Sequence, residues 1–415
     1  MKDPEEPMIP VELALEIVLR EALPLPEERI PLADAAGRVL AQEVLSDSDH
    51  PPFAKALMDG YALRSADVRE VPVELEVVEE IPAGKMPSHA VAAGQAARIM
   101  TGAPLPEGAD AVQMVEKTGE LSRDGHIQIL EPVNPGANMA PRGQQLKAGQ
   151  RVLSPGDFLT AARLGVLAGV GCGKVTVRRR PRVAVAPTGD ELVDYDSVPE
   201  DGQIRNSNGV ALMAAARTLG AGVSDSGIVR DDATALSECI ATGLLSDLLL
   251  LSGGVSMGTY DLVERALEMQ GVDVFFRKIA IRPGKPAVFG RKGRCLVFGL
   301  PGNPVSSLVI FEVLVAPAIR RMQGLPRPEG RFLHATLEAT VVQRTGRTAY
   351  LPGTLRFVEG SARIRPIPTT GSADLPAYSR ADALLILPAG RERVDAGERV
   401  EVLVLESSWQ ASLLG

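Results

Sequence analysis

The amino-acid sequence predicts a multidomain chain that combines a central, doubly wound α/β domain with β-rich domains, the last of them small and barrel-like. Residues 181–323 alternate short apolar strands with helices, a pattern typical of a parallel sheet covered on both faces. Residues 71–150 and 331–406 instead show short alternating runs separated by Gly and Pro, which indicate β domains. A length of 415 residues also exceeds what one ordinary core uses.

Local signals predict the elements outside the α/β region. A helix over residues 11–23 is expected to end at Pro24, because proline cannot continue a helix. A second short element covers residues 30–45. Residues 59–62 are expected to form a tight loop after two prolines, and a further helix is expected over residues 160–168.

Within the α/β region, uniformly apolar runs are the expected strands and the segments between them carry helix signals. Asp231 and Asp232 can cap the helix that runs to Gly243. The expected strands cover residues 182–186, 223–229, 248–251, 272–276 and 296–298. Two other helices are expected over residues 207–219 and 305–322, and a third follows the turn at Gly253 and Gly254 and runs to Met269.

Charge and composition argue against several classes of protein. The chain has 44 Lys and Arg against 52 Asp and Glu, and its net charge of −8 without a basic stripe argues against general nucleic-acid binding. The N-terminus lacks the features of a signal peptide, and no apolar run of about 18 residues could span a membrane. Cys172, Cys239 and Cys295 are far apart, which predicts buried thiols. We therefore expect a cytoplasmic protein.

Three loops are expected where strands of the α/β region end and helices begin, which is where open sheets bind ligands. They cover residues 187–192, 252–261 and 299–304. Gly253, Gly254 and Gly258 would let backbone N–H groups approach an anion at a helix N-terminus. Each loop alone is also compatible with a simple turn, and its acids with helix caps. Together they suit a phosphorylated ligand with Mg²⁺, although no P-loop motif is present.

Two further sets of side chains indicate ion binding. Asp231 and Asp261 are expected to begin helices at adjacent strand ends, so both carboxylates could face one Mg²⁺. Lys278, Arg282 and Lys285 fall within eight positions, in a segment held by two prolines and a glycine. Such a rigid group of cations favours an oxyanion site over a solvated surface.

Six stretches, in their order and spacing, resemble the molybdopterin molybdenumtransferase family, which includes bacterial MoeA and the C-terminal domain of the scaffold gephyrin. The run Arg-Ile-Met-Thr-Gly-Ala-Pro-Leu-Pro-Glu-Gly-Ala-Asp-Ala-Val at 98–112 is specific by itself. The resemblance spans almost the whole chain. The six stretches are residues 58–62, 98–112, 188–192, 252–261, 283–286 and 300–305.

The resemblance implies an elongated chain with interleaved domains. Residues 7–26 and 178–326 would form the α/β molybdopterin-binding domain, and residues 27–45 and 147–177 a linking domain. The β-rich inserted domain would cover residues 46–146, and the C-terminal β domain residues 327–415.

The resemblance also implies a reaction and an assembly. Molybdenum from molybdate would be inserted into adenylylated molybdopterin, with Mg²⁺-dependent cleavage of the pyrophosphate bond and release of AMP. A homodimer would share each active site between the α/β domain of one subunit and the β-rich inserted domain of the other. A molybdopterin adenylyltransferase and apo-molybdoenzymes would be further partners.

Matching positions carry the family's functional residues over to this chain. The residues expected to act in catalysis are Asp59, Thr101, Glu191, Asp231, Ser256, Asp261, Lys278 and Arg282, with Asp231 and Asp261 as metal ligands. Those expected to bind the substrates are Gly253, Gly254, Gly258, Pro301, Gly302, Asn303, Lys285, Pro286, Arg347 and Ser372. Lys285, Pro286 and Ser372 resemble a molybdate pocket.

There are three departures from the family pattern, one of which covers two adjacent positions. Arg282 stands where Lys is usual, so the charge is kept but the geometry changes. Gln144 and Gln145 stand where many members have acids, and Pro352 where a second Arg is common. The sequence does not distinguish molybdate from tungstate. Two alternative hypotheses are an adenylyltransferase-like enzyme and a gephyrin-like scaffold; the additional domains and the retained acids count against them.

Overall fold

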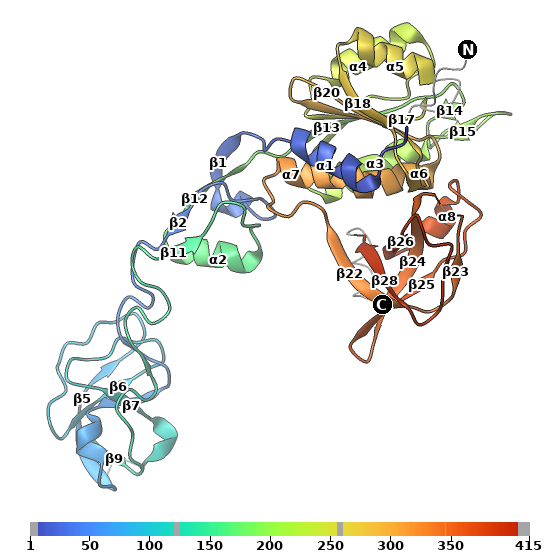
Figure 1. The fold of residues 1–415 in the computed structure, drawn as a ribbon. Coiled ribbons are helices and arrows are strands. Elements are labelled where there is room, and N and C mark those ends of the chain that lie inside the picture. The colour runs from blue at the N-terminus through green and yellow to red at the C-terminus, as the bar shows by residue number, and fades with distance from the viewer. Residues whose placement is uncertain (1–6, 120–124, 255–259, 345, 406–415) are drawn as a thin grey trace.

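The computed structural model describes residues 7–119, 125–254, 260–344 and 346–405. Figure 1 shows an elongated molecule in which an α/β sheet and a β-barrel lie together, while a separate β domain is carried at the end of a thin stalk. The predicted fold class is therefore confirmed. No helix among the described residues is long and apolar enough to cross a membrane.

The α/β sheet has six strands in the order β16-β13-β17-β21-β20-β18. Strands β16, β13, β17 and β21 are parallel, and their buried residues are almost all aliphatic. The strands are β13 (Arg182–Pro187), β16 (Gly222–Asp225), β17 (Leu248–Ser252), β18 (Asp273–Lys278), β20 (Pro286–Lys292) and β21 (Cys295–Leu300). Strand β20 was not predicted. It is antiparallel to both neighbours, and Gly293 with φ +58° turns the chain from β20 back into β21 as a hairpin.

Helices cover both faces of this sheet, as the doubly wound prediction requires. One core joins α1 (Val11–Glu21), α3 (Ser207–Thr218) and the long C-terminal helix to one face, and a second core joins α4 (Ala233–Gly243) and α5 (Tyr260–Met269) to the other. The long helix was predicted as one element and is continuous. It consists of α6 (Pro304–Ile310), a π-helical turn at Phe311–Val315 and α7 (Ala316–Met322).

The β domain at the end of the stalk is a six-stranded sheet in the order β7-β4-β6-β5-β9-β8. The expectation of a tight loop at residues 59–62 is wrong, because Gly60–Leu63 form the fully buried strand β4. Gly60 allows this pairing, since a Cβ there would lie 1.9 Å from the Gln113 carbonyl oxygen. The other strands are β5 (Val73–Ile81), β6 (Gln95–Ile99), β7 (Ala111–Met114), β8 (Thr118–Gly119) and β9 (His126–Ile129), and short 3-10 turns lie at Ser65–Val68 and Val115–Lys117.

The stalk consists of two chain segments that run in opposite directions. Three antiparallel pairs join the outgoing and the returning segment, and α2 (Ala161–Gly169) packs beside them on a small apolar core. The predicted helix over residues 160–168 is confirmed, and the Thr160 side chain caps its first turn. The pairs are β1 (Glu27–Pro31) with β12 (Lys174–Arg178), β2 (Val44–Leu45) with β11 (Arg151–Leu153), and β3 (Lys55–Ala56) with β10 (Met139–Ala140); a 3-10 turn lies at Leu32–Asp34.

The C-terminal strands close into a small barrel, because β24 pairs with both β25 and β26. Strand β19 (Ile281–Arg282) belongs to the α/β region, yet it pairs in parallel with β24 and so joins the two domains. The barrel strands are β22 (Arg331–Leu337), β24 (Thr348–Val358), β25 (Ser361–Pro366), β26 (Ala383–Leu387) and β28 (Arg399–Val404), with β23 (Val341–Val342), β27 (Arg393–Val394) and helix α8 (Leu375–Tyr378) at its surface.

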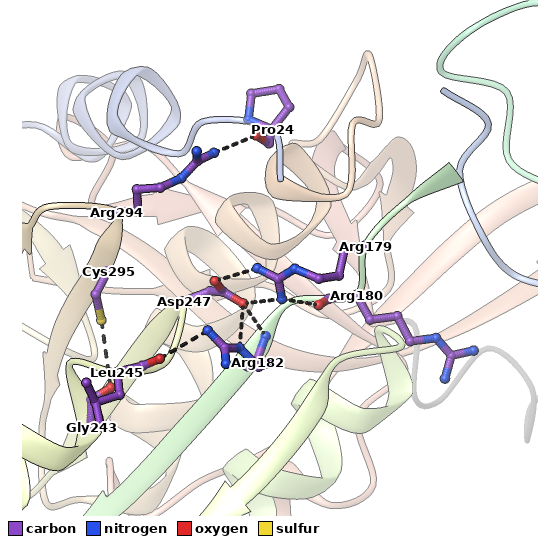
Figure 2. Close-up of polar contacts among 9 residues, drawn as sticks. All are labelled: Pro24, Arg179, Arg180, Arg182, Gly243, Leu245, Asp247, Arg294 and Cys295. Atoms are coloured by element: carbon purple, nitrogen blue, oxygen red, sulfur yellow. Dashed lines mark hydrogen bonds and ion pairs between the residues drawn. The ribbon is translucent and has the colours of Figure 1, made fainter. Parts of the chain in front are cut away.

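An ion-pair network fixes the amino-terminal edge of the α/β sheet (Figure 2). The Arg179 guanidinium donates to both carboxylate oxygens of Asp247 at 2.8 Å, and the backbone N–H of Arg182 donates to the same carboxylate at 2.7 Å. Burial raises the pKa of Asp247, but these hydrogen bonds and the two positive charges together lower it below its ordinary value of 3.8. Beside it, burial raises the pKa of the Cys295 thiol to about 12, while Cys172 and Cys239 are half-buried and free.

We expect Asp247→Asn to lower the free energy of unfolding by about 2 kcal/mol, because one partner of a mostly buried, charge-assisted pair is lost. A carboxyl group with a lowered folded-state pKa contributes stability above its unfolded pKa and loses it as pH falls towards the folded value. The variant should therefore lose less stability than the wild type as pH falls below 3.8. Urea denaturation at pH 7 and pH 3 measures both effects. The control Glu398→Gln removes an exposed pair with Arg391 and should change stability by under about 0.5 kcal/mol.

Candidate functional site

Three loops meet at the carboxyl edge of the α/β sheet, because the strands that precede them, β13, β17 and β21, are adjacent and parallel. The Thr188 N–H donates to the Ser252 carbonyl at 2.8 Å, and the Gly253 N–H donates to the Leu300 carbonyl at 3.1 Å. The Asn208 amide, at the start of α3, donates to Ser252 Oγ at 3.0 Å and to the Gly302 carbonyl at 2.8 Å. Gly253, Gly254, Pro301, Gly302 and Asn303 are thus gathered at one edge.

Gly253 is the tightest point among these loops. Its φ is +105°, and a Cβ would lie 2.3 Å from the Thr188 carbonyl oxygen. We therefore expect Gly253→Ala to separate the two loops and to lower the free energy of unfolding by about 2–4 kcal/mol. Thermal denaturation measures this. Gly302→Ala is the matched control, because a Cβ there would have only an ordinary contact of 3.8 Å and little stability should be lost. Equal melting temperatures for both variants would contradict the steric argument.

Carboxylates gather beside the first loop. The Asp231 N–H donates to Asp190 Oδ1 at 3.3 Å, and Asp232, not Asp231, caps helix α4. Burial, followed by the negative charges of Asp190 and Glu191, raises the pKa of Asp231. The negative charges of Asp190 and Glu191 thus disfavour the ionised form of Asp231, and a cation placed beside this carboxyl group would stabilise that form. Among the described residues, no group of three or more His, Cys, Asp or Glu side chains has the arrangement of a metal site.

The glycine-rich second loop is only partly described. Ser256 and Gly258 lie outside the described residues. Asp261 stands in the first turn of α5, where the sequence places it, but its side chain also lies outside the described part. The roles expected for these three residues stay predictions.

A basic pocket of about 500 Å³ lies between the α/β region and the barrel. Arg282 and Lys285 line it from the α/β side, while Arg347 and Ser372 line it from the barrel. The Ser372 hydroxyl accepts a hydrogen bond from the Asn303 amide at 2.9 Å, so the third loop of the sheet edge also borders the pocket. Strand β19 holds the two halves together, and the Arg347 guanidinium donates to the Ile281 carbonyl at 3.3 Å.

Of the three cations that were predicted to act together, Arg282 and Lys285 line the pocket and Lys278 does not. Lys278 is not among its lining residues; it ends β18, where it pairs in register with Pro286 and its carbonyl accepts from the Ile9 N–H at 3.2 Å. Pro286 does line the pocket, and so does Pro352 on the barrel side. Arg347 therefore provides the positive charge on the barrel side of the pocket.

Asp59 and Thr101 form a pair of their own in the distant β domain. The Thr101 hydroxyl and then its backbone N–H, both 2.7 Å from Asp59 Oδ1, lower the pKa of that carboxyl group. Both residues are exposed. Figure 1 shows their domain, with β6 and β7, at the end of the stalk opposite the α/β sheet. Within one chain, the structure does not bring this pair to Glu191 and Asp231.

Sequence reasoning missed several residues that shape the site. Asn208 bridges two loops, and its only signal is an amide in the first turn of a helix at the sheet edge. Asp374 accepts hydrogen bonds from the Thr370 backbone and hydroxyl at 2.9 Å and 3.1 Å, which fixes the loop before Ser372. An Asp before Leu-Pro is a helix-cap signal that could have indicated this turn.

The fold and the site define a class of protein. It is a multidomain α/β protein with loops of the kind that bind ligands at the carboxyl edge of its sheet, and with a basic pocket between this α/β region and a β-barrel. Comparison with protein families supports a specific member of this class. Residues 9–171 match the MoeA N-terminal region (domain I and II), residues 184–321 a probable molybdopterin binding domain, and residues 334–405 the MoeA C-terminal region (domain IV). The chain belongs to the molybdopterin molybdenumtransferase family, and it is therefore a transferase.

Relatives match over nearly the full length. The molybdopterin molybdenumtransferase of Nostoc sp. is 39% identical over 388 residues, which cover 91% of this chain and 88% of the relative. The Staphylococcus aureus protein of the same name is 31% identical over 96% of both chains. A crystal structure of the MoeA protein from Pyrococcus horikoshii has a TM-score of 0.80 and 34% identity, and covers 96% of this chain and 99% of that one. The expected family and its role in molybdenum-cofactor biosynthesis are confirmed.

Proposed function

We propose that this chain inserts molybdenum from molybdate into adenylylated molybdopterin and releases AMP. The observation that carries the proposal is that one loop belongs both to the sheet edge and to the lining of the basic pocket. Pro301 and Asn303 belong to the loops at the sheet edge and also line the basic pocket. A phosphorylated ligand on the sheet-edge loops and an oxyanion in the pocket would therefore lie next to each other, as a transfer between them requires.

The residues divide into two chemical groups. Gly253 and Gly254, both with positive φ, would let backbone N–H groups approach the phosphorylated substrate, and Gly302 and Asn303 would border it. Arg282, Lys285 and Arg347 would hold the tetrahedral dianion through charge-assisted hydrogen bonds, with Ser372 and Pro286 shaping the wall. Lys278, which belongs to the same segment as Arg282 and Lys285, would act at the border of the pocket.

Mg²⁺ is part of the proposal. The raised pKa of Asp231, caused by burial and by Asp190 and Glu191, fits carboxylates that face a cation. Asp231 and Asp261 would hold the ion, with Glu191 beside them, and Mg²⁺ would neutralise charge on the pyrophosphate group. Ser256 and Gly258 would complete the same loop.

We also propose a cytoplasmic homodimer in which each site takes Asp59 and Thr101 from the other subunit. The distance of their domain from the α/β sheet of the same chain in Figure 1 supports this arrangement. A molybdopterin adenylyltransferase that supplies the substrate and apo-molybdoenzymes that take the product are the further partners of the proposal.

The direct test incubates the purified chain with adenylylated molybdopterin, Mg²⁺ and molybdate and follows AMP release. AMP should appear only when all three are present, and tungstate in place of molybdate measures the oxyanion preference. An adenylyltransferase would instead consume ATP and release pyrophosphate with free molybdopterin. A pure scaffold would give neither product. Either of these outcomes would refute the proposed reaction.

A further inference from the structure

A second cavity lies at the opposite edge of the α/β sheet from the loops described above. Its volume is about 570 Å³, and it is bordered by three parts of the chain. Gly37 and Phe158 come from the stalk. Thr218–Gly220 and Gln323 lie at the carboxyl ends of helices α3 and α7, and Arg331 begins the barrel strand β22. None of its lining residues lines the basic pocket between α/β region and barrel.

The cavity is strongly basic in a chain whose net charge is −8. Arg180, Arg320, Arg327 and Arg331 line it, and no Asp or Glu is among its lining residues. Nearby arginines are neutralised: Arg38 pairs with Glu28, Arg178 with Glu27, and Arg179 with Asp247.

Three of the lining arginines have no such partner. Arg180, Arg327 and Arg331 are exposed and, within the part of the chain that the structure describes, lie within 4.0 Å of no carboxylate. Figure 2 shows the Arg180 side chain extending away from the Asp247 network that holds its neighbours. Arginines in one cavity repel one another, so an anionic ligand bound there would remove an unfavourable interaction.

Apart from the arginines, Thr218 and Gln323, the lining consists of glycine and apolar residues, and it includes an aromatic ring. Phe158 is 42% exposed, and Leu219 and Leu325 also face the cavity. A volume of this size suits a small molecule of roughly mononucleotide dimensions. An exposed ring beside guanidinium groups is the combination that binds a flat base at one end and phosphate at the other.

We infer that this cavity, here called the junction site, binds a phosphorylated ring compound of mononucleotide size and thereby joins the stalk, the α/β region and the barrel. The inference does not depend on the proposed reaction, since the residues concerned lie at the other edge of the sheet. Arg327 and Arg331 would contact the phosphate, and Phe158 the ring.

The test measures backbone hydrogen exchange with AMP as the probe, because this readout shows where a ligand binds. In the wild type, AMP should slow exchange in residues 218–220 and 323–331. The double variant Arg327→Gln/Arg331→Gln should lose this protection and require at least about tenfold more AMP for half-saturation. Arg363→Gln, an exposed cation on barrel strand β25, is the matched control and should bind like the wild type.

Three outcomes would overturn the inference. Protection confined to residues 188–191 and 252–254 would mean that AMP binds only at the carboxyl edge. Equal protection by inorganic pyrophosphate and AMP would refute the proposal that the cavity binds a ring. The variant Phe158→Ala tests the same proposal, because it removes the aromatic side chain. If light scattering shows that the double variant lowers the oligomeric state while AMP protection is unchanged, the arginines contact a second copy of the chain instead.

Discussion

Mixing inactive Asp59→Asn subunits with inactive Asp231→Asn subunits is expected to restore AMP release. If each site combines Asp59 of one subunit with Asp231 of the other, a heterodimer of the two variants has one site with neither substitution. Half of the dimers in an equal mixture are heterodimers, so activity should reach about a quarter of the wild-type value. The measurement requires subunit exchange before the assay and each variant alone as a baseline.

The control distinguishes sharing from simple reassociation. A mixture of Glu191→Gln with Asp231→Asn should stay inactive, because the two carboxylates lie in one domain of one chain and interact electrostatically. Activity in the first mixture only would support shared sites. Inactivity of both mixtures after proven exchange would show that each site is built within one chain, which would contradict the proposed assembly.

Lys285→Ala is expected to raise the molybdate concentration for half-maximal AMP release by roughly 10–100-fold, since one charge-assisted contact to a dianion contributes about 1.5–3 kcal/mol. Lys285 lines the basic pocket with Arg282 and Arg347, so the effect should fall on molybdate and leave the dependence on adenylylated molybdopterin nearly unchanged. Initial rates over a molybdate titration measure it.

Arg363→Ala provides the matched control for this titration. It removes an exposed cation of the same barrel that lies outside the pocket. Its molybdate curve should coincide with that of the wild type. If Lys285→Ala gives the same curve as Arg363→Ala, the pocket between the α/β region and the barrel does not hold the oxyanion.

The sequence predicts the fold class well where pattern and packing agree. The apolar runs at 182–186 and 248–251 became the central strands β13 and β17, because a strand buried on both faces needs side chains such as these at every position. The prediction from the sequence was wrong at residues 59–62. Asp-Gly resembles a turn, yet Gly60 serves as the close-approach position of a central strand, and this depends on the distant Gln113. Local signals do not contain that information.

The site was predicted in parts. Chain order along a parallel sheet was enough to bring Thr188, Gly253 and Asn303 to one edge. The basic pocket needed more, because its second half comes from the barrel, and the β19–β24 pairing that brings Arg347 to Arg282 is not encoded by any local pattern. Lys278 was grouped with Arg282 by sequence distance alone, whereas the strand end and the following turn separate it from the pocket lining.

The position of helix α1 has a consequence for synthesis on the ribosome. Its buried face packs on the core that contains helix α7 (Ala316–Met322), yet the whole stalk and the β domain are translated between them. At a translation rate of about 5–20 residues per second, on the order of tens of seconds pass between the synthesis of α1 and that of α7. An isolated helix of 11 residues is marginal in water. We therefore expect the β domain to fold first and the N-terminal segment to stay accessible to proteases until helix α7 has been translated.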